Sequence, residues 1–181
     1  RNSLFNVVSV FSGTGYGDGD LLAWGPFPFM VVFLVGAIGG CTGSTGCSLK
    51  VFRYQILLRS FAARIRKLYA PSRVTVVTYS GTRVTEDVLN SIILMFTLFM
   101  LTFFVIAVGI SLTGMPFLPS VTGAWTAVFN VGPAFGAEVT SSGSLENFPE
   151  PAKWLMTLGM FLGRLEIVAA AVLLLPSFWR G

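Results

Sequence analysis

The chain has 181 residues, of which 54 % are hydrophobic and 11 % are charged, and its mean hydropathy is +0.77. A soluble domain carries about 25 % charged residues, so this chain has too little charge to cover a surface that faces water. The composition excludes an ordinary soluble domain and indicates an integral membrane protein. The chain also lacks histidine and shows no nucleophile paired with a base, so we do not expect an enzyme.

The first predicted element, Ser3–Phe11, is an apolar helix that is too short to cross a membrane. It leads into FSGTGYGDGD, where every second residue from Gly13 to Gly19 is glycine. This stretch matches the potassium-channel filter pattern T-V-G-Y-G-D at its last four positions. Glycine permits the dihedral angles with which backbone carbonyls replace the hydration shell of a cation. We expect one wall of an ion filter here, and an ordinary glycine-rich turn is the alternative. The residues assigned to this wall are Gly13, Thr14, Gly15 and Tyr16.

An apolar run over Leu22–Ile38, a candidate membrane span, continues into the glycine cluster GAIGGCTGSTGCS at 36–48. Each glycine costs about 1 kcal/mol in a helix, so the helix is expected to break there. Close helix packing through G-x-x-x-G spacing is the alternative. A phosphate loop is not expected, because Cys47 and not lysine follows Gly46. Without histidine, Cys41 and Cys47 supply too few ligands for zinc and are expected to be free thiols.

The basic residues are concentrated in one stretch. Eight of the twelve Lys and Arg residues lie between Lys50 and Arg83, and no acid lies among them. Because basic loops stay in the cytoplasm, this stretch is predicted to be inside, and the concentration in one loop argues against nucleic-acid binding. The acidic loops are predicted to be outside, and Asp18 and Asp20 are expected to raise the local cation concentration at the outer mouth of the filter. Their acids are Asp18, Asp20, Glu138, Glu146 and Glu150.

A second unit repeats the pattern of the first. Val88–Leu112 is an almost unbroken apolar helix, Pro116 and Pro119 mark the chain turning back, and Thr122–Phe129 is a short helix. Re-entrant backbone is tolerated at membrane depth only where it is buried in protein or faces a water-filled path. Two such segments therefore favour a pore. The second wall of the filter is assigned to Asn130, Val131 and Gly132.

The last apolar run, Trp154–Trp179, carries Arg164 near the middle of the predicted span. A charge at that depth is costly and faces the interior of the protein. Glu166 is two residues away and cannot pair with Arg164 on the same helix face. The free carbonyls of a broken glycine loop could receive the guanidinium, and a salt bridge to another unit is the alternative.

Three blocks of sequence carry a family resemblance. The first is GGCTGSTG at 39–46 followed by KVFR at 50–53, and the second is NVGP at 130–133. The third is GRLE at 163–166 followed by PSFWR at 176–180. Together they resemble the Trk/Ktr/HKT superfamily of potassium transporters, and within it the TrkH type.

The resemblance implies an all-α membrane protein of repeated helix, re-entrant pore helix with filter, and helix units around a pseudo-fourfold ion pore. The family has four units per polypeptide. This chain would be the third without its first helix, plus the fourth, with Gly15 and Gly132 as filter glycines. No covalent cofactor is implied, and potassium at the filter is the only metal. Ala134 follows Pro133 where the family often has glycine, which leaves the degree of selectivity open.

On this basis, residues 1–58 contain the pore helix, filter and inner helix of one unit, with the intramembrane glycine loop at 36–48. Residues 59–85 form a basic cytoplasmic linker, and residues 86–181 form a complete helix–pore loop–helix unit. The resemblance implies a gate made by the glycine loop and the arginine that contacts it. The gate residues are Gly39, Gly40, Cys41, Thr42, Gly43, Ser44, Thr45, Gly46 and Arg164.

The function implied is potassium uptake across the cell inner membrane by a multi-pass protein in membrane lipid. The resemblance also implies a homodimer and a cytosolic nucleotide-binding regulatory subunit of the TrkA type on the basic inner face. A cation channel and a symporter driven by H⁺ or Na⁺ are both compatible with the motifs. The alternative is a non-conducting membrane scaffold whose glycines serve helix packing.

Overall fold

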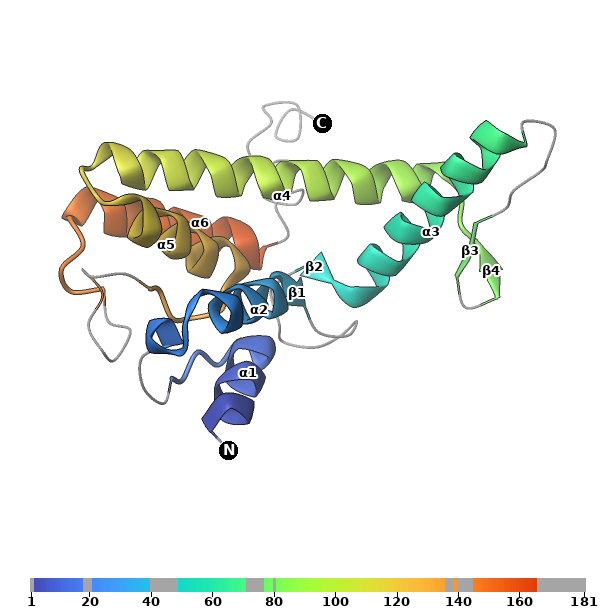
Figure 1. Ribbon diagram of the computed structural model, residues 1–181. Helices are drawn as coiled ribbons and strands as arrows, with labels where there is room; N and C mark the ends of the chain where they lie inside the picture. Colours follow the sequence, from blue (N-terminus) through green and yellow to red (C-terminus); the bar gives the residue numbers. More distant parts are fainter. Residues whose placement is uncertain are drawn as a thin grey trace, which may run out of the picture.

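The computed structural model describes residues 2–17, 21–39, 49–70, 77–79, 81–135, 139 and 145–165. Helices account for most of these residues, and two short strand pairs lie between them (Figure 1). The elements of the first half are α1 (Asn2–Ser12), the 3₁₀ turn η1 (Leu21–Trp24), α2 (Pro26–Ala37), β1 (Ile38–Gly39), β2 (Leu49–Lys50) and α3 (Val51–Tyr69). Those of the second half are β3 (Thr78–Tyr79), β4 (Thr82–Arg83), α4 (Glu86–Leu112), α5 (Phe117–Phe129) and α6 (Glu150–Arg164).

α4 confirms the long apolar helix expected over Val88–Leu112, and it is the one helix of the described part that is long and apolar enough to cross a membrane. Its 27 residues extend over about 40 Å, which exceeds the hydrocarbon thickness of about 30 Å. Phe99, Ile106 and Ile110 are buried. Leu101 is exposed, so α4 has one face against protein and one face without a partner in this part of the chain.

The other two apolar runs differ from single spanning helices. Leu22–Ile38 forms η1 and then the 12-residue α2, because Gly25, with a φ of +95°, turns the chain between them. α2 extends over about 18 Å and is too short to cross a membrane alone. Of the run Trp154–Trp179, the structure describes the end of α6, which begins at Glu150. Residues 166–181 lie outside the described residues.

α5 is the short helix expected over Thr122–Phe129, but it begins earlier, at Phe117. Pro119 therefore lies in its first turn and not before it, where the missing N–H of proline costs no helical hydrogen bond. α5 packs against both α4 and α6 (Figure 1), and Trp125 and Ala127 are fully buried. At about 20 Å, α5 is too short to span the hydrocarbon and ends among the packed helices.

The chain leaves the helical path of α2 at Ile38, as the glycine cluster predicts. Ile38 and Gly39 pair in parallel with Leu49 and Lys50, so the chain returns to the place where it left the helix. Residues 40–48, which connect the two strands, lie outside the described residues.

Gly36, expected to belong to the broken segment, still lies within α2. A Cβ on Gly36 would overlap the indole ring of Trp125 and would come within 2.9 Å of Val10 Cγ1. The ring of Phe33 stacks on Trp125 with centroids 4.8 Å apart. At this one position, therefore, glycine serves the close packing of α1, α2 and α5.

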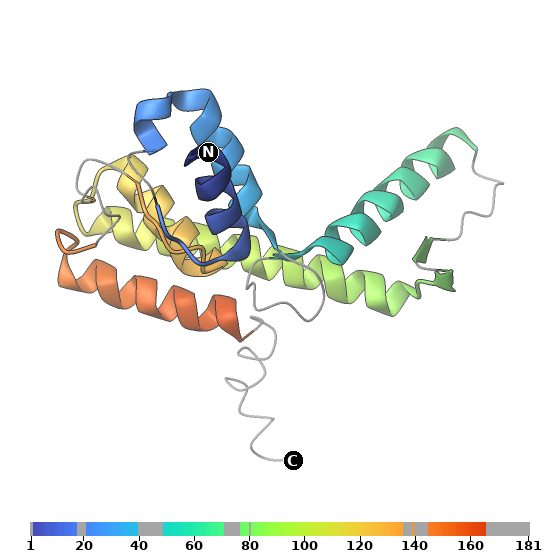
Figure 2. The same cartoon turned by 90° about the horizontal axis from the view of Figure 1, so that it is seen from below.

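α3 runs as one helix over Val51–Tyr69, so the expected boundary between residues 58 and 59 falls inside a continuous helix. Tyr54 fixes its beginning, because its hydroxyl donates to the Ala37 carbonyl at 3.1 Å and its ring lies edge-on to Phe96 of α4. Towards its C-terminal end, α3 slants away from α4 (Figure 2).

The expected linker, residues 59–85, is partly the second half of α3 and partly a small hairpin. β3 and β4 pair antiparallel, with Thr78 opposite Arg83. The Arg59 guanidinium of α3 donates to the Thr78 carbonyl at 2.7 Å, which attaches the hairpin to the helix.

Candidate ion filter

The first candidate wall begins where α1 ends. The backbone N–H of Gly13 donates to Val10 O at 3.2 Å, and those of Thr14 and Gly15 donate to Ser9 O at 3.1 and 3.4 Å. Gly13 and Gly15 have φ angles of +74° and +75°, which side-chain-bearing residues adopt at a steric cost. The turn therefore directs its N–H groups back to the helix.

Hydroxyl groups brace this turn, and the sequence analysis did not identify two of them. The hydroxyl of Thr14 donates to Ser9 O at 3.2 Å and lies 3.1 Å from each of the hydroxyl oxygens of Ser9 and Ser12. Ser12 also donates to Ser9 O at 3.1 Å. The signal in the sequence is a serine, serine, threonine series at the end of a helix, where such side chains bond to local backbone.

The second candidate wall begins where α5 ends. Asn130 caps the helix in the left-handed conformation, with a φ of 52°. Val131 N donates to Thr126 O at 3.2 Å, and Gly132 N donates to Thr126 Oγ1 at 2.9 Å. Thr122 Oγ1 accepts from Phe135 N at 3.1 Å. Two threonines, four residues apart on α5 and both missed in the sequence analysis, thus hold the segment that follows the helix.

The two walls meet at their central glycines. A Cβ built on Gly15 would lie 2.8 Å from Gly132 Cα, and one built on Gly132, whose φ is +113°, would lie 2.7 Å from Gly15 Cα. A Cβ on Gly13 would lie 3.5 Å from Asn130 O. The residues that the sequence assigns to different walls are therefore brought together, in register, with no room for a side chain at the point of closest approach.

In both turns, backbone N–H groups donate the hydrogen bonds, and the carbonyl groups are not needed as acceptors. Within the described part of the chain, none of the hydrogen bonds ends on the carbonyl oxygens of these residues. Carbonyl oxygens that are not engaged with donors can ligate a dehydrated cation. Tyr16, also assigned to the first wall, is 74 % exposed. The carbonyl-bearing residues concerned are Gly13, Thr14, Gly15, Asn130, Val131 and Gly132.

α6 packs closely behind the second wall. A Cβ on Gly163 would overlap the Val128 carbonyl and would lie 2.8 Å from Asn130 Nδ2, and one on Gly159 would lie 2.7 Å from Ile106 Cδ1. The Asn130 side chain donates to the Met160 carbonyl at 3.3 Å. Glycines four residues apart allow such close helix approach, and this spacing was the signal available in the sequence.

Comparison with known proteins decides the family. The profile of the TrkH family, described as cation transport protein, matches residues 1–180. The chain belongs to the TrkH family. It is 40 % identical over 176 residues to the Trk system potassium uptake protein TrkI of Halomonas elongata, covering 97 % of this chain and 36 % of that protein. It is 34 % identical over 181 residues to the Trk system potassium uptake protein TrkH of the same organism, covering 99 % and 37 %.

The fold of this TrkH-family chain also matches a solved structure. The crystal structure of the potassium transporter TrkH from Vibrio parahaemolyticus superimposes with a TM-score of 0.87 at 30 % identity, covering 99 % of this chain and 38 % of that one. The expected all-α membrane fold is confirmed. The chain spans little more than a third of the length of these relatives.

The candidate gate of this TrkH-family chain is described only at its two edges. Gly39 lies in β1, and Arg164 is exposed in the last turn of α6. Residues 40–46, which supply the other candidate gate positions, lie outside the described residues. Among the described residues there is no cluster of three or more His, Cys, Asp or Glu side chains that could hold a metal.

Proposed function

We propose that this chain supplies two walls of a selectivity filter through which the complete TrkH-family protein takes up potassium. The observation that carries the proposal is the contact between Gly15 and Gly132, each with a positive φ and each next to carbonyls that accept no hydrogen bond from the described residues. The names of the relatives, Trk system potassium uptake proteins, support potassium as the ion. Further walls would come from parts of the complete protein beyond these 181 residues.

The chemistry of the walls suits a weakly hydrated monovalent cation. Neutral carbonyl oxygens replace hydration water without binding the ion so strongly that it cannot leave. The N–H bonds to Ser9 O and to Thr126 Oγ1 hold the two backbones in place from behind. A cation would therefore meet a preorganised ring of oxygens, which lowers the cost of ordering them on binding.

We also propose that the glycine loop and Arg164 gate this path from the inner side. The pairing of Ile38–Gly39 with Leu49–Lys50 supports a loop that leaves the α2–α3 path and returns to it. Arg164, at the end of α6, would donate to loop carbonyls and favour the arrangement that blocks the path. A gate needs an element with two arrangements of similar energy, and a glycine-rich segment is suited to this.

The basic stretch Arg59–Arg83 is proposed to face the cytoplasm and to receive a nucleotide-binding regulatory subunit of the TrkA type. The complete protein would be a multi-pass, homodimeric protein of the inner membrane.

Close packing explains Gly36, Gly159 and Gly163, which contact side chains or backbone of neighbouring helices. Helix packing alone does not explain Gly15 and Gly132, which lie in turns beyond the helices and meet each other backbone to backbone, and this favours a pore over a scaffold.

The decisive experiment is ion flux into liposomes that contain the complete protein. We expect uptake of rubidium, a potassium analogue, that potassium competes away and sodium does not. The matched control is the same protein with Gly132→Asp, whose side chain would enter the contact with Gly15. Absence of rubidium uptake by monodisperse wild-type protein, or equal competition by sodium, would contradict the proposal. Uptake without any H⁺ or Na⁺ gradient would indicate a channel, and dependence on such a gradient would indicate a symporter.

A further inference from the structure

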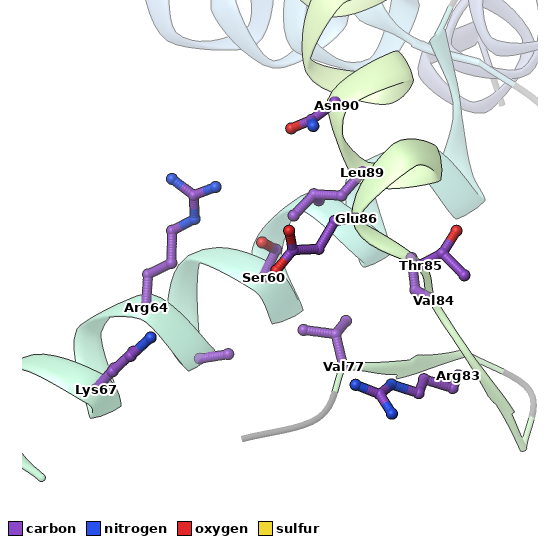
Figure 3. Close-up of a pocket in the computed structure, with 11 residues that line it drawn as sticks. Ser60, Arg64, Lys67, Val77, Arg83, Val84, Thr85, Glu86, Leu89 and Asn90 are labelled. Carbon is purple, nitrogen blue, oxygen red and sulfur yellow. The ribbon is translucent and has the colours of Figure 1, made fainter. Parts of the chain in front are cut away.

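A hollow of about 440 Å³ lies between α3, the hairpin and the first turn of α4, far from the candidate filter. Figure 3 shows its lining, with the side chains of α3 on one side and those of β4 and α4 on the other. The polar and charged residues around it include Ser60, Arg64, Lys67, Arg83, Glu86 and Asn90.

The hollow is positively charged. Arg64, Lys67 and Arg83 contribute three cations, against the single carboxylate of Glu86. None of these four side chains takes part in a salt bridge or hydrogen bond with another residue of the described part. Guanidinium groups bind phosphate oxygens through paired, charge-assisted hydrogen bonds, so the charge and the donor types both fit a phosphate group.

The beginning of α4 adds to this preference. α4 starts at Glu86, and Thr85 at its N-cap makes no capping hydrogen bond through its side chain. The N–H groups of a first helical turn have no intrahelical partners, and the helix dipole favours an anion there. Thr85, Glu86 and Leu89 all line the hollow, so this helix end faces the same space as the three cations.

The hollow lies beside the beginning of the apolar part of α4. α4 is longer than the hydrocarbon is thick, and its apolar run starts at Val88, next to the hollow. α4 exposes Leu94, Leu101, Phe104 and Val108, which at helical spacing continue the face of the helix on which Glu86 and Asn90 line the hollow. An apolar helix face that begins beside a cluster of cations is typical of the boundary between hydrocarbon and headgroups.

We propose that this hollow binds the phosphate of an anionic phospholipid headgroup, with the acyl chains along the exposed apolar side chains of α4, and that cations of the same stretch outside the hollow, such as Arg66, remain for the regulatory subunit. The lipid would join α3, the hairpin and α4 at the place where α3 slants away from α4 (Figure 2). The apolar face of α4 favours a phospholipid over a free phosphate or a nucleotide as the ligand, because only a phospholipid has acyl chains that can contact it.

The test is native mass spectrometry of the complete protein, offered phosphatidylglycerol, phosphatidylcholine, inorganic phosphate or ATP. We expect phosphatidylglycerol to bind more tightly than phosphatidylcholine, which has the same phosphate but no net charge. Arg64→Gln and Arg83→Gln should each weaken phosphatidylglycerol binding by about tenfold, which is about 1.4 kcal/mol. Glu86→Gln should strengthen it, because a like charge is removed.

Arg66→Gln is the matched control, since it removes the same charge from α3 outside the hollow. Equal effects of Arg64→Gln and Arg66→Gln, or equal binding of the two lipids, would overturn the proposal. Binding of inorganic phosphate or ATP without phosphatidylglycerol would overturn the lipid assignment. Should an arginine variant fail to fold, Glu86→Gln decides alone, because unchanged or weaker phosphatidylglycerol binding would contradict the proposal.

Discussion

Gly15 and Gly132, which belong to different helix–turn units, face each other so closely that a Cβ on either would lie 2.7 to 2.8 Å from the Cα of the other. Each also has a left-handed φ. Two independent constraints, backbone conformation and the absence of space, thus require glycine at both positions. Substituting either glycine is therefore the most direct way to alter the candidate filter.

Gly15→Ser and Gly132→Ser are each expected to lower the preference for potassium over sodium. The side chain would push the walls apart and displace the carbonyls that flank the contact. Loss of one ligand contact worth about 1.4 kcal/mol corresponds to about a tenfold loss of selectivity. Flux ratios in liposomes, normalised to monodisperse protein, measure the effect.

Gly114→Ser is the control for backbone strain, because Gly114 has a φ of +89° and nothing lies within 4 Å of its Cβ position. It should cost stability, as a left-handed φ does for any side chain, without a change in selectivity. If all three variants shift selectivity equally, or if neither filter variant shifts it, the assignment of the filter is wrong.

Thr126→Val is expected to destabilise the second wall. Thr126 is 1 % exposed, and its hydroxyl accepts the Gly132 N–H at 2.9 Å, so valine of similar shape would leave that donor unpaired. A buried unpaired donor costs about 1–3 kcal/mol. We expect a lower midpoint of thermal unfolding and reduced selectivity. Thr97→Val is the control, since that hydroxyl donates only to Ile93 O within α4; similar behaviour of both variants would contradict the role of Thr126.

Arg164→Ala is expected to raise ion flux in the absence of the regulatory subunit. Loss of charge-assisted hydrogen bonds worth about 1.5–3 kcal/mol would shift the ratio of closed to open states by about tenfold to a hundredfold. Deleting residues 42–45 should have the same effect, and the two changes together should add little. Selectivity should be unchanged, because neither change alters a residue that is assigned to the candidate filter.

The control for Arg164 is Lys153→Ala on the same helix, whose exposed ion pair with Glu150 is worth at most about 1 kcal/mol. It should leave the flux unchanged. The opposite result for Arg164→Ala, a joint loss of folded protein and flux, would indicate a structural ion pair and not a gate.

Thiol labelling tests the orientation in the membrane. In a variant with Cys41 and Cys47 replaced by serine, Thr82→Cys in the hairpin should be protected from an impermeant thiol reagent in intact cells. Glu146→Cys, before α6, should react. The reason is the excess of positive charge around the hairpin, which keeps that loop inside. Both positions are exposed, so burial does not account for protection, and the reverse pattern would overturn the orientation.

Local composition was enough to predict α4, α5 and the end of α2, because apolar runs, prolines and glycines act over a few residues. It was not enough to predict the residues at which these helices begin and end. Pro119 lies inside α5 because a first helical turn accepts proline, and Gly36 remains in α2 because the packing against Trp125 outweighs its low helix propensity. Local backbone geometry decided the first case, and tertiary contact decided the second.

The sequence by itself determined that two turns would carry glycine at candidate filter positions, since the T-G-Y-G-D and N-V-G-P stretches can be read locally. Only the tertiary structure decided that Gly15 lies against Gly132, and that Ser9, Thr122 and Thr126 hold the two backbones. The physical reason is the separation along the chain of the residues that determine each feature. A left-handed turn depends on its own residues, whereas the space between the two walls depends on how α1 and α2 pack against α5, where Gly36, from another part of the chain, leaves room for Trp125 and Val10.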